Sequence, residues 1–348
     1  MCCQAPLREN FIYNLILLFY LFFSESYCII FKRHGELAEW SKAHDWKSCL
    51  RGTVTRVQIP NSPPRVHRNF DRITVDFLLG NKPARKDRIM DELKIAIHMM
   101  TQRIAEILER NAPAVYLYGS VTLDDFKIGW SDIDILVLTE RKISEAQAQK
   151  LVKLRQAMLE EDPENRYYLL FEGGMLTINS LQLGTTDRVV YWGTRGERID
   201  DHYIFDAFCM SELLDNGILL YGNDIRADLA HPDFDELKEN VQRHYETIRK
   251  YAGLSGRSLY TYGWLLDISR CIYTLRTGKI IAKTTAGEWA LKEKLCPCED
   301  ALVKTVEIRN NPSVYKNDTE ILDYAETIGE EIQRYADVLE KELKRKNA

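Results

Sequence analysis

The chain has 348 residues, enough for two domains that each bury a substantial core. Its formal net charge of −5 is unevenly spread, because residues 1–89 hold 14 Lys and Arg against 8 Asp and Glu, which leaves −11 for the remainder. An acidic body argues against a nucleic-acid-binding face, so we expect no nucleic acid partner.

The first 89 residues differ in pattern from the rest. An apolar run at 14–31 has the composition of a signal or membrane anchor, but its unbroken core is too short for a membrane span. The following segment resembles a translated tRNA gene, because Gly35 to Ala43 back-translates to a D-arm and Val57 to Pro60 to a T-arm. We therefore expect a spurious or disordered extension at 1–89, translation from Met90, and no membrane partner.

Regular patterns begin at Met90. Apolar residues recur at helical spacing from Leu93 to Leu108 and predict an amphipathic helix. A strand is predicted over Val115–Tyr118, and a second one over Ile133–Leu138. Further elements are predicted as a helix at 144–161 with Ser144 as N-cap, strands at 167–171, 175–183 and 188–192, a helix at 203–214 and a strand at 218–221.

Beyond Asp224 the sequence predicts helices alone, at 233–252, 258–276, 284–294, 298–308 and 319–344. Strands early and helices late indicate an α+β fold. We expect a small mixed-sheet domain at 90–225, followed by an all-α helical bundle domain at 226–348.

The stretch YGSVTLDDFKIGWSDIDILVL, from 118 to 138, is the most informative one. Asp132 and Asp134 are two residues apart on a strand, so their carboxylates face the same side of the sheet and can bind a hard divalent cation such as Mg²⁺. Gly119 lets the backbone N–H groups of Gly119 and Ser120 approach a phosphate. An Asp-x-Asp pair alone is common, and Gly-Ser alone is usually a turn. Together they are typical of phosphoryl or nucleotidyl transfer.

This pattern, with eleven residues between Ser120 and Asp132, resembles the signature of the DNA polymerase β-type nucleotidyltransferase superfamily. With Ser131 directly before Asp132, it most resembles the streptomycin/spectinomycin adenylyltransferases. The segment from Arg270 to Ala290 resembles their C-terminal domain, which reads R-x-x-Y-x-x-x-T-G-K-I-x-x-K-x-x-A-x-x-W-A, and every fixed position is filled.

The resemblance implies two Mg²⁺ ions held by three carboxylates, Asp132, Asp134 and a glutamate on the next strand. Glu172 is the only acid in that segment, so we expect it to bind metal and to deprotonate the acceptor hydroxyl. An exposed glutamate in a turn is the alternative. The resemblance also implies that Gly119 and Ser120 bind the β- and γ-phosphates of ATP.

An arginine and a lysine of the C-terminal domain reach the ATP phosphates in that family. Matched position by position, they fall on Arg270 and Lys283. Two cations facing a triphosphate would stabilise the leaving pyrophosphate. The alternatives are that both are surface charges, or that Lys279 takes the lysine's role.

The acceptor stays open. The streptomycin/spectinomycin enzymes hold their cationic antibiotic with acidic residues and a tryptophan, and the matching positions here are Tyr251, Gly256 and Tyr260. None is acidic, and Asp267, the nearest acid, falls on a face predicted to be buried. A neutral or weakly charged sugar-like acceptor in an aromatic pocket is an alternative, with these candidates for its lining: Tyr260, Tyr262, Trp264, Tyr191 and Trp192.

The sequence therefore predicts a cytoplasmic, monomeric, Mg²⁺-dependent adenylyltransferase that transfers AMP from ATP to a hydroxyl of a small molecule, first of all an aminoglycoside-type antibiotic. The rival hypotheses are an AMPylator of protein or tRNA, of the toxin–antitoxin kind, and a non-catalytic nucleotide sensor. The cysteines beyond residue 89 lack zinc-type spacing and indicate reduced thiols: Cys209, Cys271, Cys296 and Cys298.

Overall fold

The computed structural model describes residues 21–23, 26–33, 36–41, 85–184, 188–193, 196–253 and 256–345. The chain divides into two units, Met1–Asp91 and Glu92–Ala348. In the first, strands β1 (Leu21–Phe23), β2 (Ser26–Arg33) and β3 (Glu36–Ser41) pair antiparallel. The rest of the expected 1–89 extension up to residue 84, which includes most of the tRNA-like segment, lies outside the described residues, so its origin stays a prediction.

The second unit carries a mixed sheet of six strands in the described part of the chain, in the order β8-β7-β6-β5-β4-β9. Strands β5 and β6 pair in parallel, and all other neighbours are antiparallel. The parallel pair requires a crossover, which α3 (Glu145–Glu161) provides. The strands are β4 (Pro113–Tyr118), β5 (Ile133–Thr139), β6 (Phe171–Thr177), β7 (Val189–Gly193), β8 (Gly196–Asp200) and β9 (Ile218–Tyr221).

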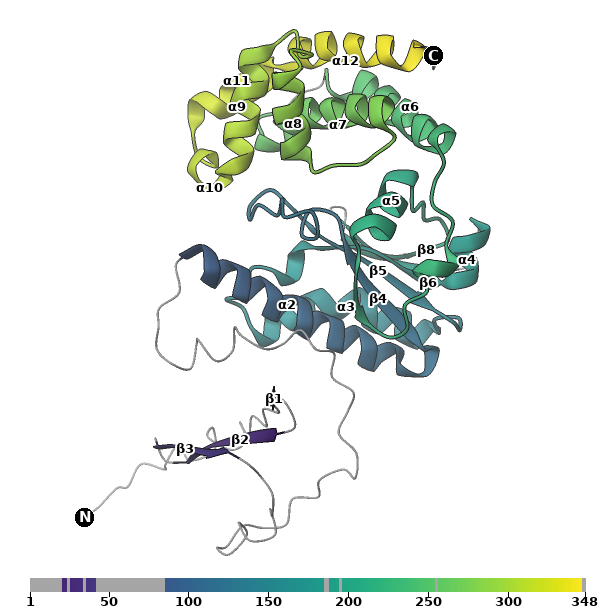
Figure 1. Cartoon of the computed structure of the whole chain (residues 1–348), viewed down its shortest axis with the longest axis vertical. Helices are drawn as coiled ribbons and strands as arrows, with labels where there is room; N and C mark the ends of the chain where they lie inside the picture. Colours follow the sequence, from purple (N-terminus) through teal and green to yellow (C-terminus); the bar gives the residue numbers. More distant parts are fainter. Residues whose placement is uncertain are drawn as a thin grey trace, which may run out of the picture. The chain divides into compact units, whose positions relative to one another are not determined.

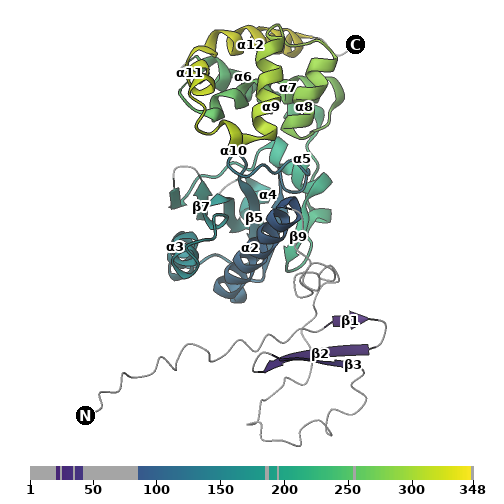
Figure 2. The same cartoon turned by 90° about the vertical axis from the view of Figure 1, so that its left-hand side faces the viewer.

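Helices cover both faces of this sheet, as Figures 1 and 2 show. Helix α2 (Arg85–Leu108) and α3 lie on one face, and α5 (Ala207–Asn216) lies on the other. Trp192 of β7 is fully buried and donates its indole N–H to the carbonyl of Leu151 on α3. On the opposite face, Leu136 and Leu138 of β5 pack with Leu213 of α5. The alternation of side chains along β5 thus directs the even-numbered residues toward α5.

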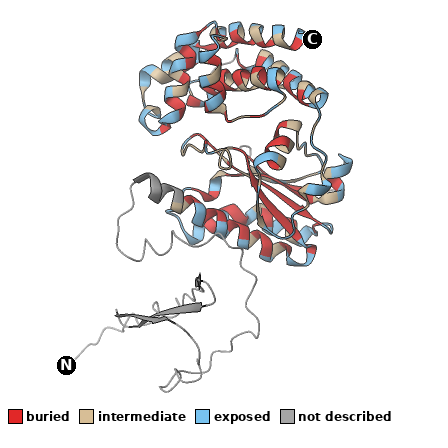
Figure 3. Cartoon of the chain, in the orientation of Figure 1, coloured by how far each residue is buried: buried red, intermediate tan, exposed pale blue. Residues whose placement is uncertain are grey.

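The remainder of the second unit is helical, with a core centred on α7. Helix α7 packs against α6, α8, α9 and α12, and its residues Leu265, Ile268 and Ile272 are fully buried. Figure 3 shows that buried residues concentrate on the sheet strands and on the inward sides of the helices. The helices are α6 (Phe234–Tyr251), α7 (Gly263–Thr277), α8 (Lys283–Lys292), α9 (Glu299–Asn310), α10 (Pro312–Tyr315), α11 (Thr319–Thr327) and α12 (Gly329–Lys344).

The predicted α+β class is confirmed, and several element boundaries were wrong. The expected strand at 167–171 is a 3₁₀ turn over Tyr168–Leu170. The expected strand at 175–183 ends at Thr177, whose hydroxyl accepts the N–H of Ser180 and begins α4 (Ile178–Leu183). The expected helix at 319–344 breaks at Ile328, next to a glycine, where a helix is weakest. Strand β8 and helix α10 were not predicted.

Among the described residues, no helix combines the length and the apolar composition that crossing a membrane requires.

Candidate functional site

Three carboxylates lie at the start of the parallel strand pair. Asp132 directly precedes β5, Asp134 is the second residue of β5, and Glu172 is the second residue of β6. The register of the two strands places Asp134 beside Glu172. Neighbouring strands are about 4.8 Å apart, so the side chains of this pair stand on one face of the sheet at close range. The predicted third acid is therefore on the neighbouring strand, and its metal-binding role stays a prediction.

Electrostatics show an excess of negative charge at this point. Burial and the charge of Glu172 raise the pKa of Asp132 to about 6, and the positive charge of Lys283 opposes the rise. Burial and the charges of Glu212 and Asp132 raise the pKa of Asp134 well above its usual range. Carboxylates that repel one another in this way favour a bound divalent cation, whose charge would restore their ionised form. The donor set thus fits Mg²⁺.

Asp132 and Glu172 are close enough for a side-chain hydrogen bond, but Asp132, Asp134 and Glu172 do not bring three ligand atoms within 4.8 Å of one another. In the described ranges, three potential metal-ligand atoms lie within 4.8 Å of one another at a different place, in Asp200, Asp201 and His202. Asp201 and His202 are exposed, and Asp200 is ion-paired with Arg198 at 2.7 Å. Exposed neighbours of this kind are solvated without a metal, so this turn is no rival to the buried site.

The Gly-Ser turn lies directly against the carboxylates. Gly119 has φ +70°, and a Cβ atom there would lie 2.2 Å from Oδ2 of Asp134. Only glycine therefore allows the backbone to pass so close to this acid. The hydroxyl of Ser120 donates to the carbonyl of Asp132 at 3.2 Å, which ties the turn to the start of β5. The structure thus brings Gly119 and Ser120 together with Asp132 and Asp134, as the sequence predicts; their phosphate-binding role is not tested by this contact.

The two predicted cations both lie near the acids and are already ion-paired. Nη1 of Arg270 on α7 lies 2.8 Å from Oε1 of Glu212 on α5. Nζ of Lys283, the first residue of α8, lies 2.8 Å from Oδ1 of Asp267. The alternative Lys279 is exposed. Neither Arg270 nor Lys283 is an isolated surface charge, and phosphate binding would require each to exchange or share its present partner.

Sequence reasoning missed Glu212 and the contact of Tyr191 with Glu172, which complete this environment. Glu212 is 6% exposed; burial raises its pKa, and the charge of Arg270 opposes that rise. The hydroxyl of Tyr191 on β7 donates to Oε1 of Glu172 at 2.8 Å. Glu212 carries no motif, because a single glutamate in a helix is ordinary. Only the packing of α5 onto the sheet brings it to Asp134.

A second buried cluster joins the loop before β5 to the helical region. The carboxylate of Asp125 accepts the hydroxyl of Thr284 at 2.6 Å and Nη2 of Arg309 at 2.9 Å. Asp125 is 4% exposed and Arg309 is 3% exposed. The guanidinium of Arg309 also lies 5.6 Å from the ring centroid of Trp130. Because Thr284 follows Lys283, this cluster fixes the start of α8 relative to the loop that begins at Gly119.

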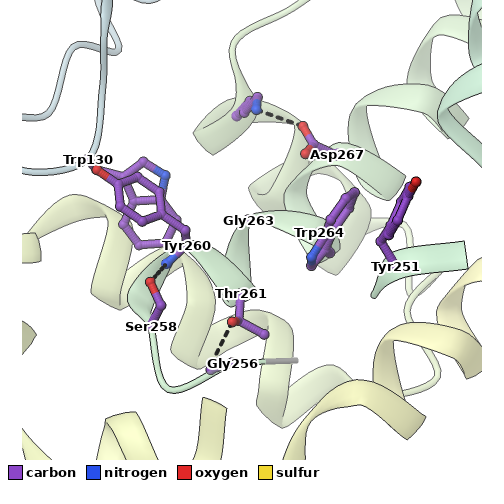
Figure 4. A pocket seen from close by; sticks show the side chains of 10 residues that line it. Trp130, Tyr251, Gly256, Ser258, Tyr260, Thr261, Gly263, Trp264 and Asp267 are labelled. Carbon is purple, nitrogen blue, oxygen red and sulfur yellow. Dashed lines mark hydrogen bonds and ion pairs between the residues drawn. The ribbon is translucent and has the colours of Figure 1, made fainter. Parts of the chain in front are cut away.

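A pocket of about 560 Å³ lies at the N-terminal end of α7 (Figure 4). The positions that match the antibiotic-binding residues of the resembling family, Tyr251, Gly256 and Tyr260, all line it. Asp267, which was predicted to lie on a buried face, lines the pocket as well, with its side chain 19% exposed. The remaining lining residues are Trp130, Ser258, Thr261, Gly263, Trp264 and Lys283.

Two of the five aromatic residues predicted as candidates for the lining do line this pocket. Tyr260 and Trp264 line the pocket. Trp192 and Tyr262 are instead fully buried core residues, and the hydroxyl of Tyr262 donates to the carbonyl of Ile321. Tyr191 is engaged with Glu172. Aromatic residues are large enough to serve in a core or a pocket, and the sequence does not separate the two uses.

Comparisons with known proteins agree with both motifs. A family model described as nucleotidyltransferase domain matches residues 102–171, and one described as aminoglycoside adenylyltransferase, C-terminal domain, matches residues 234–339. Comparison with curated protein sequences gives no match.

A similar solved structure is the spectinomycin adenyltransferase AAD(9) from Enterococcus faecialis, with ATP and spectinomycin. It has a TM-score of 0.50 and 16% sequence identity, and the match covers 69% of this chain and 97% of that chain. This likeness concerns the fold. The chain therefore joins a nucleotidyltransferase domain to the C-terminal domain of aminoglycoside adenylyltransferases, as its motifs predicted.

Proposed function

We propose that this protein transfers AMP from ATP to a hydroxyl of a small-molecule acceptor of the aminoglycoside-antibiotic kind. The observation that carries the proposal is the surplus of acidic charge at Asp132, Asp134 and Glu172, held against the Gly119 turn in a chain that has both family domains. Burial and neighbouring acids raise the pKa of Asp132 and Asp134, and such a site favours divalent cations, which adenylyl transfer requires.

Each role in the proposed reaction is assigned to particular residues of the chain. Asp132, Asp134 and Glu172 would hold two Mg²⁺, which supply Lewis-acid polarisation of the α-phosphate when bound. The backbone N–H groups at Gly119 and Ser120 bind the outer phosphates. Glu172 accepts the proton of the acceptor hydroxyl as its oxygen attacks the α-phosphorus. Pyrophosphate leaves, and Arg270 and Lys283 stabilise its charge.

The pocket beside α7 supports a small acceptor rather than a macromolecule. Its volume of about 560 Å³ lies within the range of drug-sized ligand sites. Its lining comes chiefly from the region that matches the adenylyltransferase C-terminal domain. The free cysteines of the described part agree with a reducing compartment, so we place the reaction in the cytoplasm.

Pyrophosphate release tests the proposal directly. The purified protein is incubated with ATP and Mg²⁺ and with streptomycin, spectinomycin, kanamycin or lincomycin in turn. We expect turnover with at least one acceptor, which Asp132→Ala abolishes and the exposed-site control Asp201→Ala leaves intact. An absence of turnover with every acceptor, combined with a labelled protein band when lysate and labelled ATP are supplied, would replace the small-molecule acceptor with a protein.

A further inference from the structure

The pocket beside α7 contains one carboxylate, and this carboxylate is shared with a residue of the proposed nucleotide site. Among the lining residues the structure describes, Asp267 is the only acid and Lys283 the only cation. Their ion pair, 2.8 Å between Nζ and Oδ1, is marked in Figure 4. The side chain of Asp267 is 19% exposed and that of Lys283 is 34% exposed. The pair therefore stands at the edge of the pocket, with the lysine the more accessible partner.

Lys283 acts on two groups of acids at once. Its charge opposes the raised pKa values of Asp132 and Asp134, which burial and neighbouring acids cause, so it lies within electrostatic reach of the catalytic carboxylates. Its backbone is fixed, because Thr284 is hydrogen-bonded to Asp125 through both its N–H and its hydroxyl. A lysine has a flexible four-carbon stem, so its ammonium group can exchange partners while the helix start stays in place.

Asp267 depends on Lys283 for its charge. Burial alone would raise its pKa, yet the charges of Lys283 first and Arg270 second hold that pKa below its usual value. Arg270 is ion-paired with Glu212 and acts on Asp267 only through its charge, without a direct ion pair to it. If Lys283 turned to another anion, Asp267 would be left as a poorly solvated carboxylate. Such a group takes up either a proton or another cation.

We propose that Lys283 exchanges Asp267 for the triphosphate when ATP binds, and that the freed Asp267 then binds a basic nitrogen of the acceptor. This inference rests on the proposed adenylyl transfer and names the recognition element that its acceptor site otherwise lacks. The two substrates are thereby coupled: ATP supplies the phosphates that draw the lysine away, and the acceptor replaces the charge that the lysine withdrew.

The pocket also limits the class of acceptor. One carboxylate pairs with one ammonium group, and the aromatic side chains of Tyr260 and Trp264 line the same pocket, whereas the ring of Tyr251 already has the ammonium group of Lys250 4.8 Å from its centroid. A polycation would bring several ammonium groups to a pocket with a single acid. The ammonium groups without a carboxylate partner would lose hydration energy that no ion pair replaces. The structure therefore favours a hydroxyl-bearing compound with one or two basic nitrogens.

Nucleotide affinity tests the exchange without an acceptor. Binding of the non-reactive analogue α,β-methylene-ATP with Mg²⁺ is measured by calorimetry for the wild type, Asp267→Asn and Asp267→Glu. We expect Asp267→Asn to bind roughly 3–10-fold more tightly, because Lys283 no longer has to leave an ion pair, and Asp267→Glu to stay near the wild type. In a Lys283→Gln background, Asp267→Asn should have no effect. A matched control is Asp323→Asn, which removes an exposed acid paired with Arg257.

The outcomes separate this inference from the proposed function. If the wild type fails to bind the magnesium analogue at all, adenylyl transfer itself is wrong. If the wild type binds it and a folded Asp267→Asn variant, verified by thermal unfolding, binds it equally or more weakly, the exchange is wrong and adenylyl transfer stands.

Acceptor binding tests the second half. Lincomycin, with one basic nitrogen, spectinomycin, with two, and the polycation kanamycin are titrated with and without the analogue. We expect lincomycin or spectinomycin to bind at least about 5-fold more tightly in its presence, and Asp267→Asn to abolish this coupling. Binding that ignores the nucleotide, a preference for kanamycin, or binding of none of the three would overturn the role of Asp267.

Discussion

Two buried polar clusters, one around Asp125 in the loop before β5 and one around Asp134 in β5 itself, lie nine positions apart and differ in their balance of charge. Around Asp125, a single carboxylate faces the guanidinium of Arg309 and the hydroxyl and N–H of Thr284. Around Asp134, the neighbouring groups are chiefly further acids, and the pKa of that carboxyl is raised well above its usual range by burial and by their charges. The first cluster is complete within the protein, whereas the second still needs positive charge.

This difference distinguishes an acid that is buried to stabilise the fold from acids that are buried at a candidate functional site. A buried ion pair is tolerated when hydrogen bonds satisfy its lone pairs, and Asp125 accepts bonds at both carboxylate oxygens. Acids that share a partly buried face without enough cations store unfavourable energy in the free protein. A ligand that supplies the missing charge releases that energy, so the unbalanced cluster is the place to expect chemistry.

The largest expected contrast is in turnover. Asp134→Asn should lower AMP transfer at least about 1000-fold, because a metal ligand and its charge are lost. Thermal unfolding without Mg²⁺ should show equal or higher stability, since one of several repelling acids is removed. Asp162→Asn, at an exposed position, is the control. A variant that loses several kcal/mol of unfolding free energy would place Asp134 with the structural acids instead.

The opposite pattern is expected at the balanced cluster. Arg309→Met should lower the unfolding free energy by about 3–5 kcal/mol, because buried Asp125 loses its hydrogen-bonded counter-charge and keeps only Lys127, whose Nζ lies 3.8 Å from Oδ1. Chemical denaturation measures this loss, and Asp125→Asn added to Arg309→Met should recover part of it. Arg334→Met, at an arginine whose side chain is 60% exposed, should cost about 1 kcal/mol or less. Equal losses for the two arginine variants would contradict the structural role of the cluster.

Competition between protons and Mg²⁺ for the carboxylate of Asp132 gives a further test of the comparison. Burial and Glu172 raise the pKa of Asp132 to about 6 in the cation-free protein, so Mg²⁺ has to displace a proton at acidic pH. The rise in melting temperature on adding Mg²⁺ should be clear at pH 7.5 and small at pH 5. Without metal, this raised pKa makes the folded state less stable as the pH increases from the unfolded value near 4 toward 6. Asp132→Asn should weaken both trends and leave the part due to Asp134, whose pKa is also raised, and a magnesium effect that is equal at both pH values would exclude Asp132 as a ligand.

The smallest expected effect concerns Tyr191. Tyr191→Phe removes one hydrogen bond to Glu172 and should lower turnover roughly 3–10-fold, as expected for about 0.5–1.5 kcal/mol. Steady-state kinetics should show the loss in kcat with the KM for ATP unchanged. An unchanged kcat would mean that the bond does not orient Glu172. A loss above about 100-fold would give Tyr191 a direct part in the reaction.

Local patterns in the sequence predicted much of the fold and part of the site. Strands β4 and β5 and the N-cap of α3 at Ser144 follow from periodicity and capping chemistry within a few residues. The neighbourhood of Asp132, Asp134 and Glu172 follows from the strand pairing that the family motif implies.

Contacts between residues far apart in the sequence could not be predicted from local patterns. The partners of Asp125 are 159 and 184 positions away, and no periodicity encodes contacts at that separation. Glu212 reaches Asp134 only because α5 packs on the sheet. Asp267 was judged by the face of its helix, which does not show that a pocket opens beside it. The missed residues are thus those whose setting depends on how elements pack.

The parallel pairing of β5 and β6 has a consequence for how such a protein can change. The separation between Asp134 and Glu172 is set by main-chain hydrogen bonds, whose spacing hardly varies with the side chains around them. The pocket beside α7, by contrast, is lined chiefly by side chains near the start of that helix. Substitutions there can alter which compound is accepted while the distance between these two acids is preserved. Under the proposed function, new acceptor specificities can therefore arise by mutation in the helical region while β5 and β6 stay unchanged.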